Sequence, residues 1–377
     1  AEDGIRDIGV TGVQTCALPI CPDIGNASWA FWGGAVLALS TLAGAVLQWL
    51  IQLPALARQG LGHISLSFDW RQPGVAEVLR VMGPATLASG MLQINVYTDL
   101  FFASGIAGAA AGLGYAGLLV QTPLGILSNM LLVPLLPVFS RLVAPHQRDE
   151  LIQRIRQGLM LSNASMLPLG ALMIALAGPI VALVYERGAF DGQAARMVGS
   201  LLMAYGFGMP AYLGRDVLVR VFYALGDGNT PFRISMAGIG LNALFDWLLV
   251  GSPVPGGLLL PQLNFGAPGL VLATVAVNVI SAVLLLGALQ RRLGSLPIGA
   301  WTRDTALLAL AAVVGGLLAW GMARGLHWPA GLLGLLLQTS LCGLGGAAVY
   351  GLLAGGLGVP EARQLGRRLR ERLPGGA

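Results

Sequence analysis

Long apolar runs recur along the chain and are separated by short polar gaps. From Trp29 onward there are nine such runs, each of roughly 17–25 residues, which is enough for a helix to cross a bilayer. No stretch shows the alternating pattern of a half-buried strand. The pattern therefore predicts an all-α, polytopic transmembrane bundle of about nine spanning helices. The runs lie near residues 29–53, 81–104, 113–139, 158–184, 197–222, 234–251, 267–289, 305–322 and 329–354.

Arginine marks every second gap between these runs. Of the 22 basic residues, 17 lie in alternate gaps or in the C-terminal tail, whereas the intervening gaps hold only Arg187, Arg196 and Arg324. Cytoplasmic loops of membrane proteins are enriched in Lys and Arg. The alternation therefore predicts a cytoplasmic C-terminus and an external start for the first run.

Composition agrees with a membrane protein and excludes several soluble classes. Hydrophobic residues make up 55% of the chain and charged residues only 10%, against about 25% charged in soluble domains. The net charge of +5 resides at helix ends and in the tail, which suits contact with anionic membrane lipids and not nucleic-acid binding. The three cysteines and three histidines show no metal-ligand spacing. We predict no catalytic residues, no metal site and no cofactor.

The first twenty residues resemble a translated sequencing adapter. Glu2–Asp7 and Val10–Ile20 match the in-frame translation of a widely used short-read adapter, with Ile8 and Gly9 in place of its variable index. We therefore exclude residues 1–20 from fold reasoning, as one would an expression scar. The expectation is that the chain is truncated at its N-terminus.

Ionisable residues inside the apolar runs are functional candidates, because charge in a membrane is costly. Arg215 and Asp216 lie well inside the run 197–222, which favours a cavity-facing role, and Arg220 lies near its end. The alternative is a structural pair, since Asp216 and Arg220 at i,i+4 can bridge along one helix face. Asp99 and Asp246 lie nearer the ends of their runs, where a solvated interface position is an equal alternative.

Prolines and asparagines within the apolar runs are candidates for hinges and for hydrogen bonds between helices. Pro123, Pro168 and Pro210 are hinge candidates, because proline frees backbone carbonyls and bends membrane helices; ordinary kinks are the alternative. Asn242 and Asn278 are predicted to form interhelical hydrogen bonds and not to belong to a site.

The stretch from Tyr205 to Ser235, YGFGMPAYLGRDVLVRVFYALGDGNTPFRIS, resembles the lipid II flippase family known as MurJ or MviN. Its matching positions follow the family pattern of Tyr, Gly-x-Pro-Ala-Tyr and Arg-x-Phe-Tyr-Ala-x-x-Asp-x-x-Thr-Pro. They are Tyr205, Gly208, Pro210, Ala211, Tyr212, Arg220, Phe222, Tyr223, Ala224, Asp227, Thr230 and Pro231. Further matches are the segment LLPVFSRL at 135–142, the segment YERGAFD at 185–191, with Arg187 and Asp191, and the region GLVLATVAVN at 269–278.

The resemblance implies a fold and an activity. Family members have fourteen helices in a MATE-like arrangement of two six-helix lobes, of which this chain would supply the last nine helices. The expected organisation is a last helix of the N-terminal lobe plus cytoplasmic loop at 21–76, a six-helix C-terminal lobe at 77–290, two additional helices at 291–360 and a basic tail at 361–377. The implied activity is flipping of lipid II across the bacterial cytoplasmic membrane by alternating access, with the cell-wall synthesis machinery as a further partner. Arg215, Asp216, Arg220 and Asp99 would then line or gate the cavity, and Asp227, Thr230, Pro231, Arg187 and Asp191 would belong to motif loops.

Two departures and three alternatives accompany this interpretation. Many relatives carry an Asp-Arg pair where this chain has Gly117-Leu118, and an Asp-Thr-Arg-Thr-Pro loop where it has the segment Asp227–Pro231. A multidrug or polysaccharide-lipid exporter of the same superfamily would share the topology, and the chain could also be an inactive fragment. A membrane enzyme acting on lipid-linked sugars is disfavoured, because no clustered carboxylates or histidines occur on the cytoplasmic loops.

Overall fold

The computed structural model describes residues 27–58, 94–142, 144–187, 190–251, 263–294 and 296–357, and these contain helices and turns but no strand. Expectations for residues 1–20, for most of the second apolar run and for the basic tail lie outside the described residues. Internal contacts divide the chain into two compact units. Each unit is described by itself.

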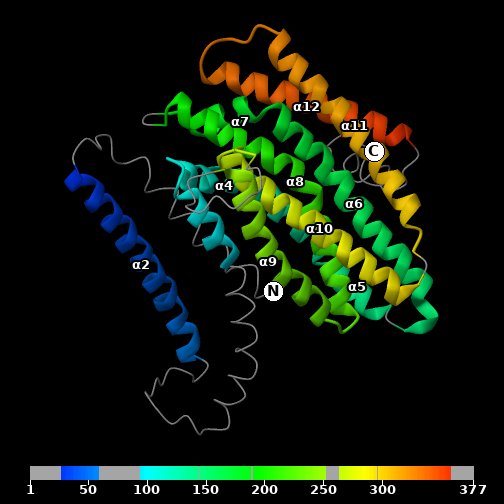
Figure 1. Ribbon diagram of the computed structural model, residues 1–377. Coiled ribbons are helices and arrows are strands. Elements are labelled where there is room, and N and C mark those ends of the chain that lie inside the picture. Colours follow the sequence, from blue (N-terminus) through cyan, green and yellow to red (C-terminus); the bar gives the residue numbers. More distant parts are fainter. Residues whose placement is uncertain are drawn as a thin grey trace. The chain divides into compact units, whose positions relative to one another are not determined.

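The first unit contains one described helix, α2 (Ala27–Arg58), drawn in blue in Figure 1. It includes the first predicted run and extends beyond it at both ends. Leu39, Leu47 and Ile51 are exposed on its surface, and its apolar part covers Leu39–Pro54. The prediction of a helix at this run is confirmed.

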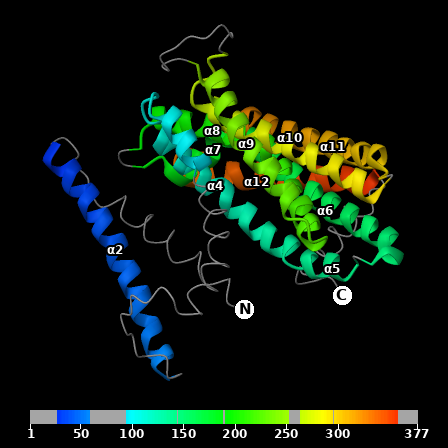
Figure 2. The same ribbon diagram turned by 60° about the horizontal axis from the view of Figure 1, so that its bottom comes forward.

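The second unit is a bundle of long helices (Figures 1 and 2). A helix over residues 94–103 precedes the labelled helices. The labelled helices are α4 (Ala109–Leu132), α5 (Leu135–Arg141), α6 (Arg148–Ala175), α7 (Ala177–Tyr185), α8 (Gly192–Ala224), α9 (Asn229–Val250), α10 (Ala267–Leu293), α11 (Ile298–Gly325) and α12 (Leu332–Gly356).

Six helices of the described residues are long and apolar enough to cross a membrane. They begin at Ala109, Arg148, Asn229, Ala267, Ile298 and Leu332. Helix α8 has 33 residues but is not among the six. Two predicted runs are each divided, the third near Pro134 between α4 and α5 and the fourth at Leu176 between α6 and α7. The structure therefore supports a multi-pass helical bundle, and the count of nine remains a prediction.

Helix α8 lies in the middle of the bundle and packs against α4, α6, α7 and α10. Small residues permit these approaches. A Cβ at Gly208 would overlap Val275 of α10 and the ring of Tyr212. The glycine of the Gly-x-Pro-Ala-Tyr motif therefore has a packing role, because it lets α8 and α10 meet.

The last two helices pack on α6 through polar contacts. Arg156 donates from Nη2 to Oδ2 of Asp304 at 2.7 Å, and Asn163 donates from Nδ2 to Oγ1 of Thr305 at 3.0 Å. On α12, the hydroxyl of Tyr350 donates to the carbonyl of Ala164 at 2.8 Å. These contacts join α11 and α12 to the same unit as α6.

Arginine-bearing helix ends gather at one end of this unit. Arg292, at the end of α10, contacts Asp227 in the connection between α8 and α9. The guanidinium of Arg148, at the start of α6, lies against Gly294 beyond the end of α10. The Arg156–Asp304 pair brings the start of α11 to the same place. The three basic gaps that the structure describes in this unit, after the third, fifth and seventh runs, thus share one end of the bundle.

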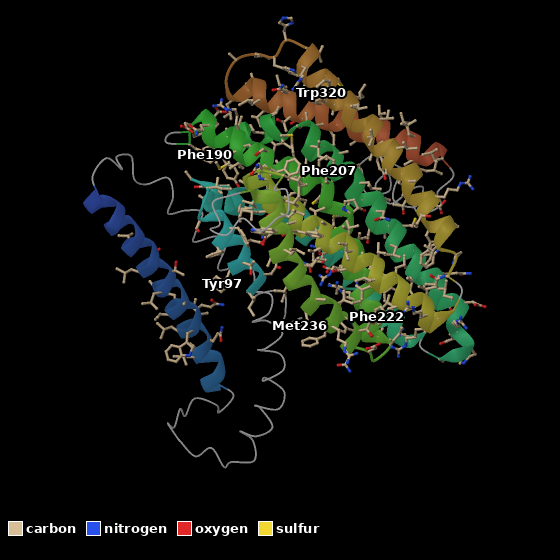
Figure 3. All side chains as sticks on the ribbon, viewed as in Figure 1. Tyr97, Phe190, Phe207, Phe222, Met236 and Trp320 are labelled. Carbon is tan, nitrogen blue, oxygen red and sulfur yellow. The ribbon has the colours of Figure 1, made fainter. Side chains whose placement is uncertain are left out.

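Large apolar side chains cover much of the outer surface. Tyr97 and Phe207 are 67% and 65% exposed, and Met236 and Trp320 are exposed as well; Figure 3 labels all four. Such extensive exposure of apolar side chains exceeds the scattered patches of soluble proteins. Such a surface is the one expected of helices that contact lipid.

Candidate functional site

A cluster of polar side chains lies inside the bundle, where three helices meet. Asn242 of α9 donates from Nδ2 to Oδ1 of Asp99 at 2.7 Å and to Oδ2 of Asp246 at 3.0 Å. Thr274 of α10 donates from Oγ1 to Oδ1 of Asn242 at 3.3 Å. The side-chain amide of Asn242 therefore bridges two carboxylates and also accepts a hydrogen bond from the hydroxyl of Thr274. We call Asp99, Asn242, Asp246 and Thr274 the polar cluster.

Burial makes the charge state of the polar cluster important. Asn242 and Asp246 are buried, with Asp246 fully so, and within the described residues Oδ1 of Asp246 has no hydrogen-bond partner. Two carboxylates that share a site repel each other when both are ionised. Neutral donors alone do not cancel this repulsion. The arrangement is suited to holding a proton between the carboxylates, or a monovalent cation among hard oxygen ligands.

Helix α8 contributes aromatic hydroxyls near the polar cluster. The charge of Asp99 lies within electrostatic reach of Tyr205 and Tyr212. These two motif tyrosines are seven residues apart, which places them on one face of the helix. The hydroxyl of Tyr212 is buried and has no hydrogen-bond partner among the described residues. Tyr205 and Tyr212 thus share one face of α8 within electrostatic range of Asp99.

Arg215 forms a second polar site between α8 and α9. Its Nη2 donates to Oγ of Ser235 at 2.9 Å, and its Nη1 lies 4.0 Å from Oδ1 of Asp216. The side chain of Arg215 is 23% exposed and that of Asp216 is 46% exposed. Both keep access to the surface of the unit. An arginine with one neutral and one distant acidic neighbour retains capacity to bind an anion.

The carboxylate of Asp216 lies beside Arg215 and not in the alternative side-chain pair with Arg220. Arg220 donates from Nη1 to the backbone carbonyl of Asp216 at 3.4 Å, and the side-chain carboxylate of Asp216 lies next to Arg215. The i,i+4 spacing permits a side-chain bridge, but Arg220 binds the helix backbone. Among the described residues the alternative of a direct Asp216–Arg220 ion pair is not seen, although the Arg220 guanidinium still attracts the Asp216 carboxylate.

The predicted site residues are divided between two places. Ser235 and Asp246 are eleven residues apart on α9, about 16 Å along a helix. Arg215 belongs to the half of the bundle near the basic end, and Asp99 belongs to the other half. The two sites share α9 as their common element.

Asp227 organises the connection between α8 and α9. Its Oδ1 accepts the backbone N–H of Thr230 at 3.0 Å, and its Oδ2 accepts the Thr230 hydroxyl at 2.8 Å. Arg292 donates from Nη1 to the same Oδ2 at 2.8 Å and from Nη2 to the carbonyl of Leu225 at 3.1 Å. These contacts hold the pKa of Asp227 below its ordinary value, first through the Thr230 hydrogen bonds and then through Arg292. Pro231, in the first turn of α9, is buried.

The remaining motif and hinge residues lie elsewhere. Arg187 and Asp191 are exposed in the connection between α7 and α8. Pro123, Pro168 and Pro210 lie inside α4, α6 and α8, which continue past them. Their role as hinges stays a prediction.

For Asn242, Asn278 and Asp246, the contacts in the structure can be compared with the roles that the sequence predicted. The interhelical role expected for Asn242 is confirmed, but Asn242 also belongs to the candidate site. Within the described residues Asn278 donates to the carbonyl of Thr274 on its own helix, so the interhelical bond expected for it is not seen. The solvated-interface alternative for Asp246 is wrong, because that residue is fully buried. The i,i+4 spacing of Asn242 and Asp246 was the available signal for a shared face.

The fold and these sites define a multi-pass helical membrane protein with ionisable groups inside its bundle. A family model described as "Lipid II flippase MurJ" matches residues 18–339. A relative from Synechocystis sp. named "Probable lipid II flippase MurJ" is 51% identical over 292 residues, covering 77% of this chain and 52% of the relative. The "Lipid II flippase MurJ" of Burkholderia cenocepacia is 28% identical over 292 residues, covering 75% of this chain and 54% of the relative.

A solved structure shows the same fold. The structure named "Lipid II flippase MurJ, inward closed conformation" aligns with a TM-score of 0.66 at 20% identity, covering 89% of this chain and 63% of that one. The chain belongs to the MurJ family of lipid II flippases. It spans about half the length of the curated relatives named above.

Proposed function

We propose that this chain acts in moving lipid II from the inner to the outer leaflet of the bacterial cytoplasmic membrane. Family membership carries the proposal, and Arg215 supports it. A pyrophosphate-linked sugar cannot enter hydrocarbon unaided, because unpaired charge there is prohibitively costly. A polar path between lobes shields the headgroup while the polyprenyl tail stays in lipid, and alternating access moves the opening across the membrane.

Arg215 is the proposed contact for the pyrophosphate. Arg215 lies well within α8, and its side chain is partly exposed. Its guanidinium donates a hydrogen bond to the neutral hydroxyl of Ser235. Arginine binds phosphate through paired N–H donors. Asp216, next to it, limits how firmly the anion is held and helps its release. Arg220 positions this segment of α8 through its bond to the backbone.

The polar cluster is the proposed site of energy coupling. Loading a proton or a monovalent cation onto Asp99 and Asp246 removes their mutual repulsion. It would draw together the helix over residues 94–103, α9 and α10. Because α9 also carries Ser235, the partner of Arg215, a shift of α9 would link loading of the cluster to the anion site.

The gathered arginines support a cytoplasmic orientation for the basic end. The ends of α8 and α10 and the starts of α6, α9 and α11 meet there, and positively charged segments are retained inside. The proposed orientation places the C-terminus in the cytoplasm. Anionic membrane lipids and the cell-wall synthesis machinery would contact the protein from that side.

Complementation tests the proposal. Cells whose own lipid II flippase can be depleted would express a chimera in which this chain replaces the matching part of the Synechocystis relative. We expect the chimera to restore growth and to prevent lipid II from accumulating. Arg215→Glu should abolish rescue, and Arg215→Lys should retain part of it, because lysine keeps the charge but not the paired donors.

Membrane insertion and thermal stability of each variant serve as controls. If the unsubstituted chimera is present at normal abundance and stability but does not restore growth, the proposal is contradicted. Normal growth with a stable Arg215→Glu protein would contradict the role of Arg215. Rescue of drug resistance without rescue of growth would instead indicate an exporter.

A further inference from the structure

Helix α4 carries a polar stripe on an exposed side. Gln121, Gly125 and Asn129 follow each other at i, i+4 and i+8, a spacing that aligns them on one face. Gln121 and Asn129 are exposed, and Ser128 flanks the stripe. Within the described part of the chain neither amide forms a hydrogen bond. We call Gln121, Ser128 and Asn129 the amide stripe.

The other sides of α4 are different in character. Ala109, Gly112, Ala116 and Val120 are buried, and Gly112 lies against Leu201 of α8. Next to the amide stripe, Ile126 and Met130 are each 57% exposed. The helix thus has a packed side, an apolar exposed side and a polar exposed side.

This division indicates water, not lipid, on the amide stripe. Transferring an unpaired amide from water to an apolar environment is unfavourable, so two unpaired amides are unsuited to face acyl chains. Ile126 and Met130 suit acyl chains. The polar side of α4 is therefore suited to line a water-filled path.

We propose that the amide stripe contacts the uncharged part of the lipid-linked headgroup, its sugar hydroxyls and amide groups. The inference rests on the proposed function and identifies a specificity surface within it. Amides and hydroxyls both donate and accept hydrogen bonds, which matches sugar and peptide groups. The stripe offers no cation, so it does not select for phosphate. Its length, about 12 Å from Gln121 to Asn129, allows several contacts at once.

Cysteine accessibility tests the location of the stripe. In the full chain, Cys16, Cys21 and Cys342 are replaced by alanine, and single cysteines are introduced as Gln121→Cys or Asn129→Cys. Ile126→Cys and Met130→Cys are the matched controls on the same helix. Each protein is reconstituted in phospholipid vesicles and treated with a membrane-impermeant thiol reagent. We expect the two stripe positions to react at least about tenfold faster than the controls, as for a free-energy difference above about 1.4 kcal/mol. Equal rates at all four positions, or no reaction at the stripe, would overturn the proposal.

Protection by ligand tests what the stripe binds. Lipid II should slow labelling at positions 121 and 129, whereas undecaprenyl pyrophosphate without sugars should not. Equal protection by both would assign the effect to the phosphate or the tail and reject the stripe as a sugar contact. Gln121→Leu should weaken lipid II binding about threefold to tenfold, the value of one neutral hydrogen bond, and leave binding of undecaprenyl pyrophosphate unchanged.

The two proposals fail separately. Protection by lipid II without rescue in the complementation assay would remove the proposed function and keep the binding surface. Rescue without protection at the stripe would keep the function and reject this surface.

Discussion

Nη1 of Arg292 lies 2.8 Å from Oδ2 of Asp227 and so ties the end of α10 to the connection between α8 and α9. Asp227 also accepts two hydrogen bonds from Thr230 at the start of α9. One carboxylate therefore joins three helices at the basic end of the bundle. The motif residues Asp227 and Thr230 therefore have a structural role, because they hold the connection between α8 and α9 in place.

Substitutions at Asp227 should separate its hydrogen bonds from its charge. Asp227→Ala should lower the free energy of unfolding by about 1–2 kcal/mol, because both the bonds to the start of α9 and the ion pair are lost. Asp227→Asn should cost less, since the amide oxygen can still accept the Thr230 N–H. Thermal unfolding of the purified chain in detergent measures both. Equal losses for the two variants would show that the charge alone matters.

The pH dependence of stability follows from the lowered pKa of Asp227. The ordinary value is 3.8, and the folded state lowers it through Thr230 and Arg292. A lowered folded pKa contributes stability that is present above the unfolded pKa and is lost as pH falls through the folded pKa. The stability difference between the unsubstituted chain and Asp227→Asn should therefore be constant near neutral pH and shrink below 3.8. A difference that shrinks above pH 6 would contradict this assignment.

Removal of the bridging amide should destabilise the polar cluster. Asn242→Ala leaves two buried carboxylates without their shared donor, and each unsatisfied buried group costs about 1–3 kcal/mol. Asn278→Ala is the matched control, because within the described residues Asn278 bonds only to its own helix, and its loss should cost less than about 0.5 kcal/mol. Unfolding measurements in detergent compare the two. Similar losses would show that the cluster does not hold the helices together.

Neutralising Asp246 should have opposite effects on stability and on transport. Asp246→Asn removes one of two facing charges, so stability should stay equal or rise slightly. If the cluster takes up the driving cation, the same variant should lose most of its complementing activity in the chimera. Dependence of transport in vesicles on sodium at constant pH, or on pH without sodium, would identify the cation. Full activity of a stable Asp246→Asn chimera would reject the coupling role.

The contact between α11 and α12 depends on two glycines. A Cβ on Gly315 would lie 2.6 Å from the carbonyl oxygen of Gly346, and the reverse distance is 2.7 Å. Because backbone atoms cannot move aside easily, Gly315→Ala should cost about 1–3 kcal/mol. Gly321→Ala, where nothing lies within 4 Å, should be neutral or slightly stabilising in the same helix. A neutral result at Gly315 would show that the two helices can separate without loss.

Local patterns determined the membrane character of this protein. Hydropathy and helix length are properties of consecutive residues, so the apolar runs predicted α2 and α8–α12 directly. The division of the third and fourth runs was less accessible, since helix ends depend on packing as well as on proline. The motif from Tyr205 to Pro231 was recognisable because its residues lie close together in the sequence.

Partnerships between side chains were decided only by the tertiary structure. Asn242 and Asp99 are 143 positions apart, and Asn242 and Thr274 are 32 apart, so no local spacing brings them together. The sequence placed Asp216 and Arg220 on one helix face, but Ser235 on α9 decides how Arg215 is held and Asp216 lies beside Arg215. The physical reason is that hydrophobicity places each helix in the membrane independently, whereas the rotation and neighbours of each helix depend on contacts with all the others. The sequence alone determined which charges enter the membrane, and the fold decided which of them share a site.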